Sequence, residues 1–422
     1  MKNRLLLILL SFAIQAAHSQ TFTSYFTGDT SDVVTQALGG TVLMGGSVEN
    51  DSAMVWWLKR AAGGDVLVIR ASGSNGYNDY LYSDLGQSVN SVETIVCNSR
   101  QASFDPYVQR RLKECEALWI AGGDQGRYVN YWKDSPVDSL INQAITERKI
   151  AIGGTSAGMA ILSGAYFAAL NGSVTSGQAL ANPYASLVSL GNSDFLRVLV
   201  LDSVITDTHF DNPDRRGRHL AFLARLYQDM GYAWKGICSE ERTAVCIEND
   251  GLARVFGNNP NQEFAYFTQV SCLHTGLPQT CQPGQPLTWT GGNGPVLVYK
   301  VPGTNQGNNT FNLNDWRSGQ GGNWQYWSAS NGVFNSVDGA GFPDCSLTEL
   351  AESIKPEQIQ IVDLGGNWQI NTQGRGRICL FDLQGKSQPI KEIAPGQFGT
   401  CPISPGLYFI RIGEKTEKVW LR

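Results

Sequence analysis

The stretch of the sequence best suited to chemistry is GTSAG at residues 154–158, which follows the apolar run 150–154. A serine hydroxyl becomes an effective nucleophile only when a neighbouring base takes its proton. On a sharp strand-to-helix turn the serine oxygen is exposed and backbone N–H groups face the reaction, while flanking glycines leave room for the turn. We therefore predict that Ser156 is a nucleophile, in preference to a glycine-rich turn whose serine only caps a helix.

A nucleophilic serine also needs N–H donors that stabilise the negative oxygen of the transition state. The N–H group of Ala157, directly after the serine, is the first candidate. The second donor must come from another loop, and GGDQ at residues 122–125 ends a strand-like apolar run that begins at residue 117. We expect this loop to supply the donor that completes an oxyanion hole with Ala157.

The base that activates the serine is sought among three histidines, His209, His219 and His274. His209 ends the predicted strand 198–210, and the carboxyl ends of parallel strands are where chemistry gathers in α/β sheets. His219 falls in a predicted helix and His274 in a loop flanked by cysteines. This position favours His209 as the general base.

The base in turn needs a carboxylate that orients it. Asp207, Glu240 and Glu241 all lie near the ends of predicted strands, and the spacing does not choose among them.

Taken together, these residues resemble the cyanophycinase and peptidase E family of serine peptidases. The resemblance covers roughly residues 38–300 and depends on ordered motifs, which are GGDQ at 122–125, GTSAG at 154–158, DTHF at 207–210, RRGR at 215–218 and EERTA at 240–244.

The resemblance implies a flavodoxin-like core, similar to class I glutamine amidotransferases, in three layers around a mostly parallel sheet. It also implies a set of roles in the site: Ser156 as nucleophile, His209 as base, Glu241 as orienting acid, Gly123 and Ala157 in the oxyanion hole, and Gln125, Thr155, Arg215 and Arg218 in substrate binding. Family members cleave bonds next to aspartate, need no cofactor and are commonly dimers.

One position departs from the cyanophycinase pattern. Cyanophycinases release β-aspartyl-arginine dipeptides from cyanophycin and usually carry an arginine four residues after the histidine. Pro213 occupies that position here. A proline offers no hydrogen-bond donor, whereas Arg215 and Arg218 remain available to pair with carboxylates. The departure weakens the case for cyanophycin as substrate more than the case for a serine peptidase.

The elements that must position these residues alternate between apolar strands and helices. Predicted strands lie at 41–46, 65–72, 91–97, 117–123 and 150–154, and predicted helices at 51–64, 105–116 and 137–149. This alternation is typical of a parallel sheet with helices on both faces. Residues 171–200 are predicted as an insertion or irregular loop and 215–231 as a helix, before antiparallel strands at 243–250, 252–257, 263–270 and 295–301.

The two ends of the chain indicate export. Residues 1–19 have a basic tip, an apolar run and small residues before Gln20, which predicts a signal peptide. Residues 20–345 form the predicted cyanophycinase-like domain. Residues 346–422 change to alternating strands, which predicts a small β-sandwich that resembles the sorting domain of type IX secretion. We expect a secreted or cell-surface protein that the secretion machinery recognises through this module.

Composition excludes some classes of partner and ligand. The net charge is −5, and no basic cluster is interleaved with aromatic residues, so nucleic acid is not expected. No C-x-x-C pair occurs among the nine cysteines, so neither zinc nor another metal is expected. Export permits disulfides, and the predicted pairs are Cys272–Cys281 and Cys379–Cys401.

Two functions of different classes remain. The first is a secreted serine-type exopeptidase that hydrolyses aspartyl or β-aspartyl peptide bonds, with cyanophycin or a similar polymer among its candidate substrates, through an acyl-enzyme on Ser156. The second is a surface-binding protein on a catalytically altered peptidase core. The tryptophan-rich segment 316–327 would suit a carbohydrate-binding surface, although tryptophans that pack a loop are the simpler interpretation.

Overall fold

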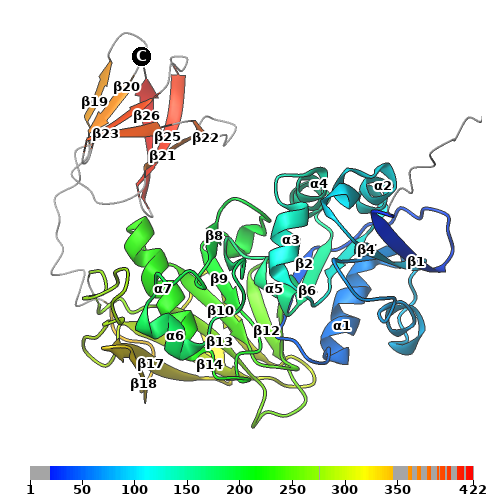
Figure 1. The fold of residues 1–422 in the computed structure, drawn as a ribbon, viewed down its shortest axis with the longest axis horizontal. Helices are drawn as coiled ribbons and strands as arrows, with labels where there is room; N and C mark the ends of the chain where they lie inside the picture. The colour runs from blue at the N-terminus through cyan, green and yellow to red at the C-terminus, as the bar shows by residue number, and fades with distance from the viewer. Residues whose placement is uncertain are drawn as a thin grey trace, which may run out of the picture.

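The computed structural model describes residues 20–274 and 276–345, together with strands between residues 360 and 421 (Figure 1). The predicted signal peptide lies outside the described residues. Within the described part of the chain, no helix combines the length and the apolar character that crossing a bilayer requires. Mixed α/β structure is present, as the alternation of strands and helices predicts.

The first sheet has ten strands, five of them parallel neighbours at its centre. In spatial order they are β1 (Phe22–Gly28), β4 (Ser91–Cys97), β3 (Asp65–Arg70), β5 (Ala117–Ile120), β6 (Ala151–Thr155), β2 (Gly40–Met44), β11 (Ala244–Ile247), β12 (Leu252–Phe256), β15 (Asn309–Asn312) and β16 (Gly319–Gln320). The run from β4 to β2 is parallel, and the outer strands are antiparallel. The sheet is therefore mixed, rather than mostly parallel as expected, because antiparallel hairpin partners extend both of its edges.

The predicted helices of this region form close to their expected bounds. They are α1 (Asp51–Leu58), α2 (Pro106–Glu114) and α4 (Pro136–Thr146); α3 (Gln125–Trp132) was not predicted. Asn50 caps α1 by accepting the Ala53 N–H group, and Asp124 caps α3 in the same way. Apolar residues of α1 pack on one face of the sheet, while α2, α3 and α4 pack on the other (Figure 1).

A second sheet of eight strands follows. Its order is β18 (Val333–Asp338), β17 (Asn323–Ser330), β14 (Val296–Pro302), β13 (Phe264–Val270), β10 (Lys235–Ser239), β9 (Val204–Asp207), β7 (Ala165–Phe167) and β8 (Leu190–Asn192). One apolar core contains residues of both sheets, and another joins this sheet to α6 (Ser176–Ala181) and α7 (Arg216–Met230). The segment 171–200 thus contains a helix and a strand where a loop was expected.

The short elements complete the described part of the chain. They are α5 (Ala157–Ala160), η1 (Lys59–Ala61), η2 (Tyr80–Asp84), η3 (Arg100–Phe104) and η4 (Leu199–Leu201).

The C-terminal strands pair only among themselves in the described residues. One four-stranded sheet contains β19 (Gln360–Asp363), β20 (Trp368–Asn371), β24 (Gln397–Thr400) and β23 (Ile390–Ala394). The other contains β22 (Ser387–Gln388), β21 (Ile378–Phe381), β25 (Gly406–Ile412) and β26 (Lys415–Leu421). The predicted strand content is present, and the β-sandwich and the domain boundary at 345/346 stay predictions.

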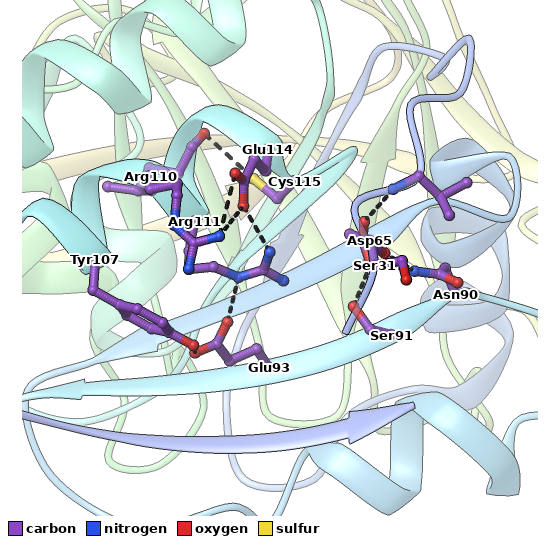
Figure 2. A network of polar contacts seen from close by, with 12 residues as sticks. Ser31, Asp65, Asn90, Ser91, Glu93, Tyr107, Arg110, Arg111, Glu114 and Cys115 are labelled. Carbon is purple, nitrogen blue, oxygen red and sulfur yellow. Dashed lines mark hydrogen bonds and ion pairs between the residues drawn. The ribbon is translucent and has the colours of Figure 1, made fainter. Parts of the chain in front are cut away.

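A buried carboxylate fixes the edge of the first sheet, as Figure 2 shows. Glu93 on β4 accepts hydrogen bonds from the Tyr107 hydroxyl at 2.8 Å, from Arg111 Nε at 2.5 Å and from the Ser24 hydroxyl of β1. Arg111 also donates to Glu114 at 2.8 Å. Because a buried charge is tolerated only when it is paired and hydrogen-bonded, this network ties β1 and α2 to β4.

The cysteine pairing differs from the expected one. Cys272 forms a disulfide with Cys345, and Cys281 is buried as a free thiol, so the predicted pair Cys272–Cys281 is wrong. The short loop between those two cysteines misled the prediction, because the fold brings the distant Cys345 next to Cys272. The predicted pair Cys379–Cys401 stays a prediction, because Cys401 lies outside the described residues and only the backbone of Cys379, in β21, is described.

The tryptophan-rich segment 316–327 packs inward. Trp316 is 4% exposed and Trp327 is fully buried. Trp324 packs against Tyr299, with ring centroids 4.8 Å apart. These side chains fill the core, which removes the basis for a carbohydrate-binding surface here.

Candidate active site

Ser156 stands on a strained turn between β6 and α5. Its backbone has φ +53° and ψ −114°, a conformation that a residue with a Cβ adopts only when its surroundings impose it. The Ser156 N–H group donates to the Met44 carbonyl at 3.0 Å, which continues the pairing of β6 with β2. The sequence GTSAG therefore forms the sharp strand-to-helix turn that exposes a nucleophile.

The flanking glycines are required by close packing. A Cβ on Gly154 would lie 2.6 Å from the Gly158 carbonyl carbon, and a Cβ on Gly158 would lie 2.0 Å from the Ile120 carbonyl oxygen. The turn thus packs directly against the end of β5. Any larger residue at these positions would push Ser156 out of place.

His209 meets the serine from the end of β9. Its Nε2 atom lies 2.8 Å from the Ser156 hydroxyl oxygen. The residue has φ +45°, and its N–H group donates to the Gly45 carbonyl at 2.8 Å. A Cβ on Gly46 would lie only 2.4 Å from Nε2, so this glycine makes room for the imidazole. The glycine pair after β2 therefore accommodates the imidazole.

Glu241 orients the imidazole from the opposite side. Its Oε1 atom lies 2.7 Å from His209 Nδ1, and its backbone N–H group donates to Asp211 at 2.9 Å. The His209 side chain is 23% exposed and that of Glu241 is 22% exposed. With Nδ1–H donating to the carboxylate, the Nε2 lone pair faces the serine hydroxyl, as general-base catalysis requires.

The other two candidate carboxylates have different partners. Asp207 is buried, forms an ion pair with Arg218, and accepts the Thr208 N–H group at 2.8 Å. The charge of Arg218 holds the pKa of Asp207 below its usual range against the effect of burial. Glu240 accepts hydrogen bonds from Phe264 N and from the Tyr266 hydroxyl. Folding thus resolves the choice that the spacing left open.

The other two histidines have separate partners. His219 is fully buried in α7, its Nε2 atom lies 3.0 Å from the Thr268 hydroxyl, and burial lowers its pKa to about 4. His274 accepts a hydrogen bond from the Trp289 ring nitrogen at 3.0 Å.

The expected oxyanion-hole residues lie on either side of the nucleophile. Ala157 is the first residue of α5, where an N–H group has no acceptor within the helix. Gly123 has φ +157° and borders the same cleft as Ser156. A Cβ on Gly122 would lie 3.6 Å from the Ser156 Cβ, so the GGDQ loop runs beside the serine.

The cleft at Ser156 has a volume of about 490 Å³. Of the predicted substrate-binding residues, Gln125, Arg215 and Arg218 line it. Arg215 donates to the Thr208 carbonyl at 2.9 Å, and burial lowers its pKa to about 10. Thr155 is 5% exposed and does not line the cleft. The cleft therefore presents arginine side chains beside the nucleophile, which suits an anionic group on a substrate.

In the described part of the chain, no group of three or more His, Cys, Asp or Glu side chains is arranged to hold a metal ion. The chemistry of the site is that of a Ser–His–Glu hydrogen-bonded chain.

Comparison with known proteins agrees with this geometry. Residues 75–254 match peptidase family S51, and this segment contains the serine, the histidine and the glutamate described above. The chain is thus similar to a family of peptidases in the part that forms the site.

The curated relatives of this chain are named cyanophycinases. The chain is 29% identical to the cyanophycinase of Trichormus variabilis over 221 residues. The aligned segment covers 52% of this chain and 64% of that protein. It is also 29% identical over 181 residues to the cyanophycinase of Synechococcus elongatus, 43% of this chain and 50% of that protein. The chain therefore spans about two thirds or less of the length of these relatives. The similarities support the resemblance to cyanophycinases and peptidase E.

A solved peptidase from an acI-B1 actinobacterium matches 66% of this chain and 98% of its own, with 12% identity and a TM-score of 0.41.

Gly46 makes room for the imidazole, a role that the sequence did not assign to it. The glycine pair 45–46 that follows β2 was the visible signal for such a close approach.

Proposed function

We propose that this protein is a serine peptidase that hydrolyses peptide or isopeptide bonds next to an aspartyl residue. The observation that carries the proposal is the hydrogen-bonded chain from Ser156 through His209 to Glu241, with distances of 2.8 Å and 2.7 Å. The similarity to peptidase family S51 supports the same class of reaction.

The geometry accounts for each step of acyl transfer. The Ser156 oxygen bonds to the substrate carbonyl carbon while its proton moves to His209 Nε2, and Glu241 stabilises the resulting imidazolium. The carbon–nitrogen bond then breaks, and the same proton passes to the leaving amine. Water, deprotonated by His209, attacks the acyl-enzyme, which releases the acid and restores the serine hydroxyl. The N–H groups of Gly123 and Ala157 stabilise the oxyanion during both acylation and deacylation.

The charge of the cleft supports an acidic residue on the acyl side of the bond. Arg215 carries no carboxylate partner among the ion pairs of the described residues, whereas Arg218 is paired with Asp207. The fork of Arg215 is therefore available to a substrate carboxylate. Relatives named cyanophycinases make a β-aspartyl-arginine polymer one candidate substrate, and Pro213 in place of an arginine makes ordinary aspartyl peptides the nearest alternative.

A serine-directed fluorophosphonate probe tests the reaction class. The wild-type chain should be labelled, and Ser156→Ala should abolish both labelling and hydrolysis of aspartyl peptides, with a loss of at least about 10⁴-fold in kcat. Glu240→Gln is a matched control, because Glu240 neighbours Glu241 in sequence but binds Phe264 and Tyr266 instead of the imidazole. If labelling persists in Ser156→Ala, the assigned nucleophile is wrong.

Export and assembly form a separate proposal. The signal-like residues 1–19 and the C-terminal strands support secretion to the cell surface or medium, with the C-terminal module as the segment that the type IX machinery recognises. The resemblance to a family of common dimers supports a homodimer. Fractionation of cells that express the full chain, with and without residues 346–422, tests export, and sedimentation of the purified protein tests the dimer.

A further inference from the structure

The orienting acid Glu241 lies in the tight turn 240–243, between β10 and β11. The Thr243 N–H group closes this turn on the Glu240 carbonyl at 3.2 Å, and Arg242 has φ +63°. Such a turn pairs only its first carbonyl with its last N–H group, so its two central N–H groups need partners from other segments. The direction of the Glu241 side chain therefore depends on what holds the turn from outside.

Two other segments supply those partners. The Arg242 N–H group donates to the Gly46 carbonyl at 3.0 Å, and the Glu241 N–H group donates to Asp211 Oδ1 at 2.9 Å. Asp211 is the one of these two acceptors that belongs to a side chain. It lies two residues after the base His209, so the acid is joined to the segment of the base twice, through the imidazole at 2.7 Å and through its own N–H group.

The loop that carries Asp211 is itself held in place. The Asn212 N–H group donates to the His209 carbonyl at 3.2 Å, which closes the backbone around Asp211. The Phe210 N–H group donates to the Ser239 carbonyl at 3.2 Å, which ties the loop to the end of β10. These hydrogen bonds present the Asp211 carboxylate to the turn of the acid from a fixed backbone.

Both segments also carry backbone strain that needs restraint. His209 has φ +45° and Arg242 has φ +63°, and such conformations persist only where the surroundings impose them. Asp211 does not border the cleft at Ser156, so it is not in place to touch a substrate bound there. Any effect of Asp211 on the reaction must therefore pass through the base and the acid that it holds together.

We propose that Asp211 is a positioning residue of the proposed serine peptidase: by accepting the Glu241 N–H group, its carboxylate sets the direction from which Glu241 meets His209. This inference rests on the proposed function, because it assigns a role in the reaction of Ser156. Without this contact the turn loses one of its outside restraints, and the imidazole is less often held with Nε2 toward the serine. The rate of acylation then falls, while the binding of substrate is unchanged.

The test compares Asp211→Ala with Asp250→Ala. Asp250 is also an exposed aspartate whose Oδ1 atom accepts one backbone N–H group, that of Leu252 at 3.0 Å, but it follows the opposite end of β11. Asp211→Ala should lower kcat and the rate of fluorophosphonate labelling about tenfold, the effect of losing one hydrogen bond to a charged acceptor. KM should change less than about twofold, and Asp250→Ala should equal the wild type in all three parameters.

A conservative variant separates this role from the charge of the loop. Asp211→Asn removes the charge but keeps an oxygen acceptor at the same place, so it should retain kcat within about threefold of the wild type. Where Asp211→Ala does not fold, Asp211→Leu gives the same test, because it also lacks an acceptor and keeps the bulk of the side chain. The expected fall in kcat is the same.

A double-mutant cycle separates positioning of the acid from a general loss of structure. Glu241→Ala should itself lower kcat about 10⁴-fold, since it removes the orienting acid. Asp211→Ala added to Glu241→Ala should cause no further loss, because no carboxylate remains for Asp211 to position.

Four results would overturn the inference: an unchanged kcat in Asp211→Ala, a change confined to KM, an equal loss in Asp211→Asn, or a further loss in the double variant. Failure of the proposed function is distinguishable, because the wild-type protein itself would then remain unlabelled by the probe.

Discussion

Replacement of Gly46 by alanine should displace the His209 imidazole without replacing any catalytic side chain. The new methyl carbon would lie 2.4 Å from His209 Nε2, 2.5 Å from Cε1 and 2.9 Å from Cδ2, whereas ordinary Cβ contacts begin near 3.4 Å. The imidazole must therefore retreat by about 1 Å from the atom that faces the serine. A misplacement of about 1 Å costs on the order of 100-fold in rate.

The assay measures kcat and KM for an aspartyl peptide, the rate of fluorophosphonate labelling, and the free energy of unfolding. Gly46 has φ +121°, so alanine also adds backbone strain of about 1–2 kcal/mol. Gly63→Ala is the matched control, because Gly63 has φ +84° and no atom within 4 Å of its missing Cβ. It should lose similar stability and keep full activity.

The reasoning is refuted if Gly46→Ala keeps the wild-type kcat and labelling rate while its stability falls by as much as that of Gly63→Ala. That outcome would mean that the imidazole position seen beside Ser156 is not the one used in catalysis.

Three further predictions follow from single contacts. Cys272→Ser opens a crosslink between residues 73 apart and should lower the free energy of unfolding by about 4 kcal/mol in urea titrations; an unchanged midpoint would contradict the pairing with Cys345. Burial raises the pKa of Glu116, which accepts the Asp65 N–H group, to about 7. The protonated carboxyl therefore favours the folded state, and its contribution to the free energy of unfolding is complete below pH 4.5 and is lost as pH rises through 7. This contribution amounts to up to about 3 kcal/mol. Glu116→Gln should flatten this part of the stability profile, and a Gln variant with the wild-type slope would refute the assignment. Arg215→Gln should raise KM for aspartyl peptides about tenfold with a smaller effect on kcat, and an unchanged KM would remove Arg215 from the binding of the acidic residue.

The central strands were predictable because their sequences are largely apolar, and glycines lie in or just after three of them, β2, β5 and β6. The run 65–72 became β3 (Asp65–Arg70), and the helix expected at 105–116 became α2, since Pro106 and the Asp105 cap fix its start. By contrast, β1 was missed because Phe22–Gly28 is an antiparallel edge strand with half its residues polar. Such a strand is stabilised by its partner β4 and carries little signal of its own.

Contacts between distant segments limited the prediction of the site. Motif spacing selected Ser156 and His209, whose side chains are in contact in the structure. It could not choose among Asp207, Glu240 and Glu241, because the partners of a carboxylate depend on which way its side chain faces after folding. The Cys272–Cys345 disulfide was not predicted for the same reason, because residues far apart in the sequence can lie close together in the fold. Thr155 was expected at the substrate, yet strand alternation leaves its side chain 5% exposed and outside the lining of the cleft.

The disulfide at Cys345 changes how the molecule bears mechanical load. Strand β18 lies at the edge of the second sheet and, among the described strands, pairs with β17 alone. Without the disulfide, a force on the chain after residue 345 would break the β17–β18 hydrogen bonds one after another. Because Cys345 is bonded to Cys272, the disulfide transmits this force directly to the loop after β13, and β18 does not bear it. A force applied to the chain after residue 345 would thus reach the loop after β13 without separating β18 from β17.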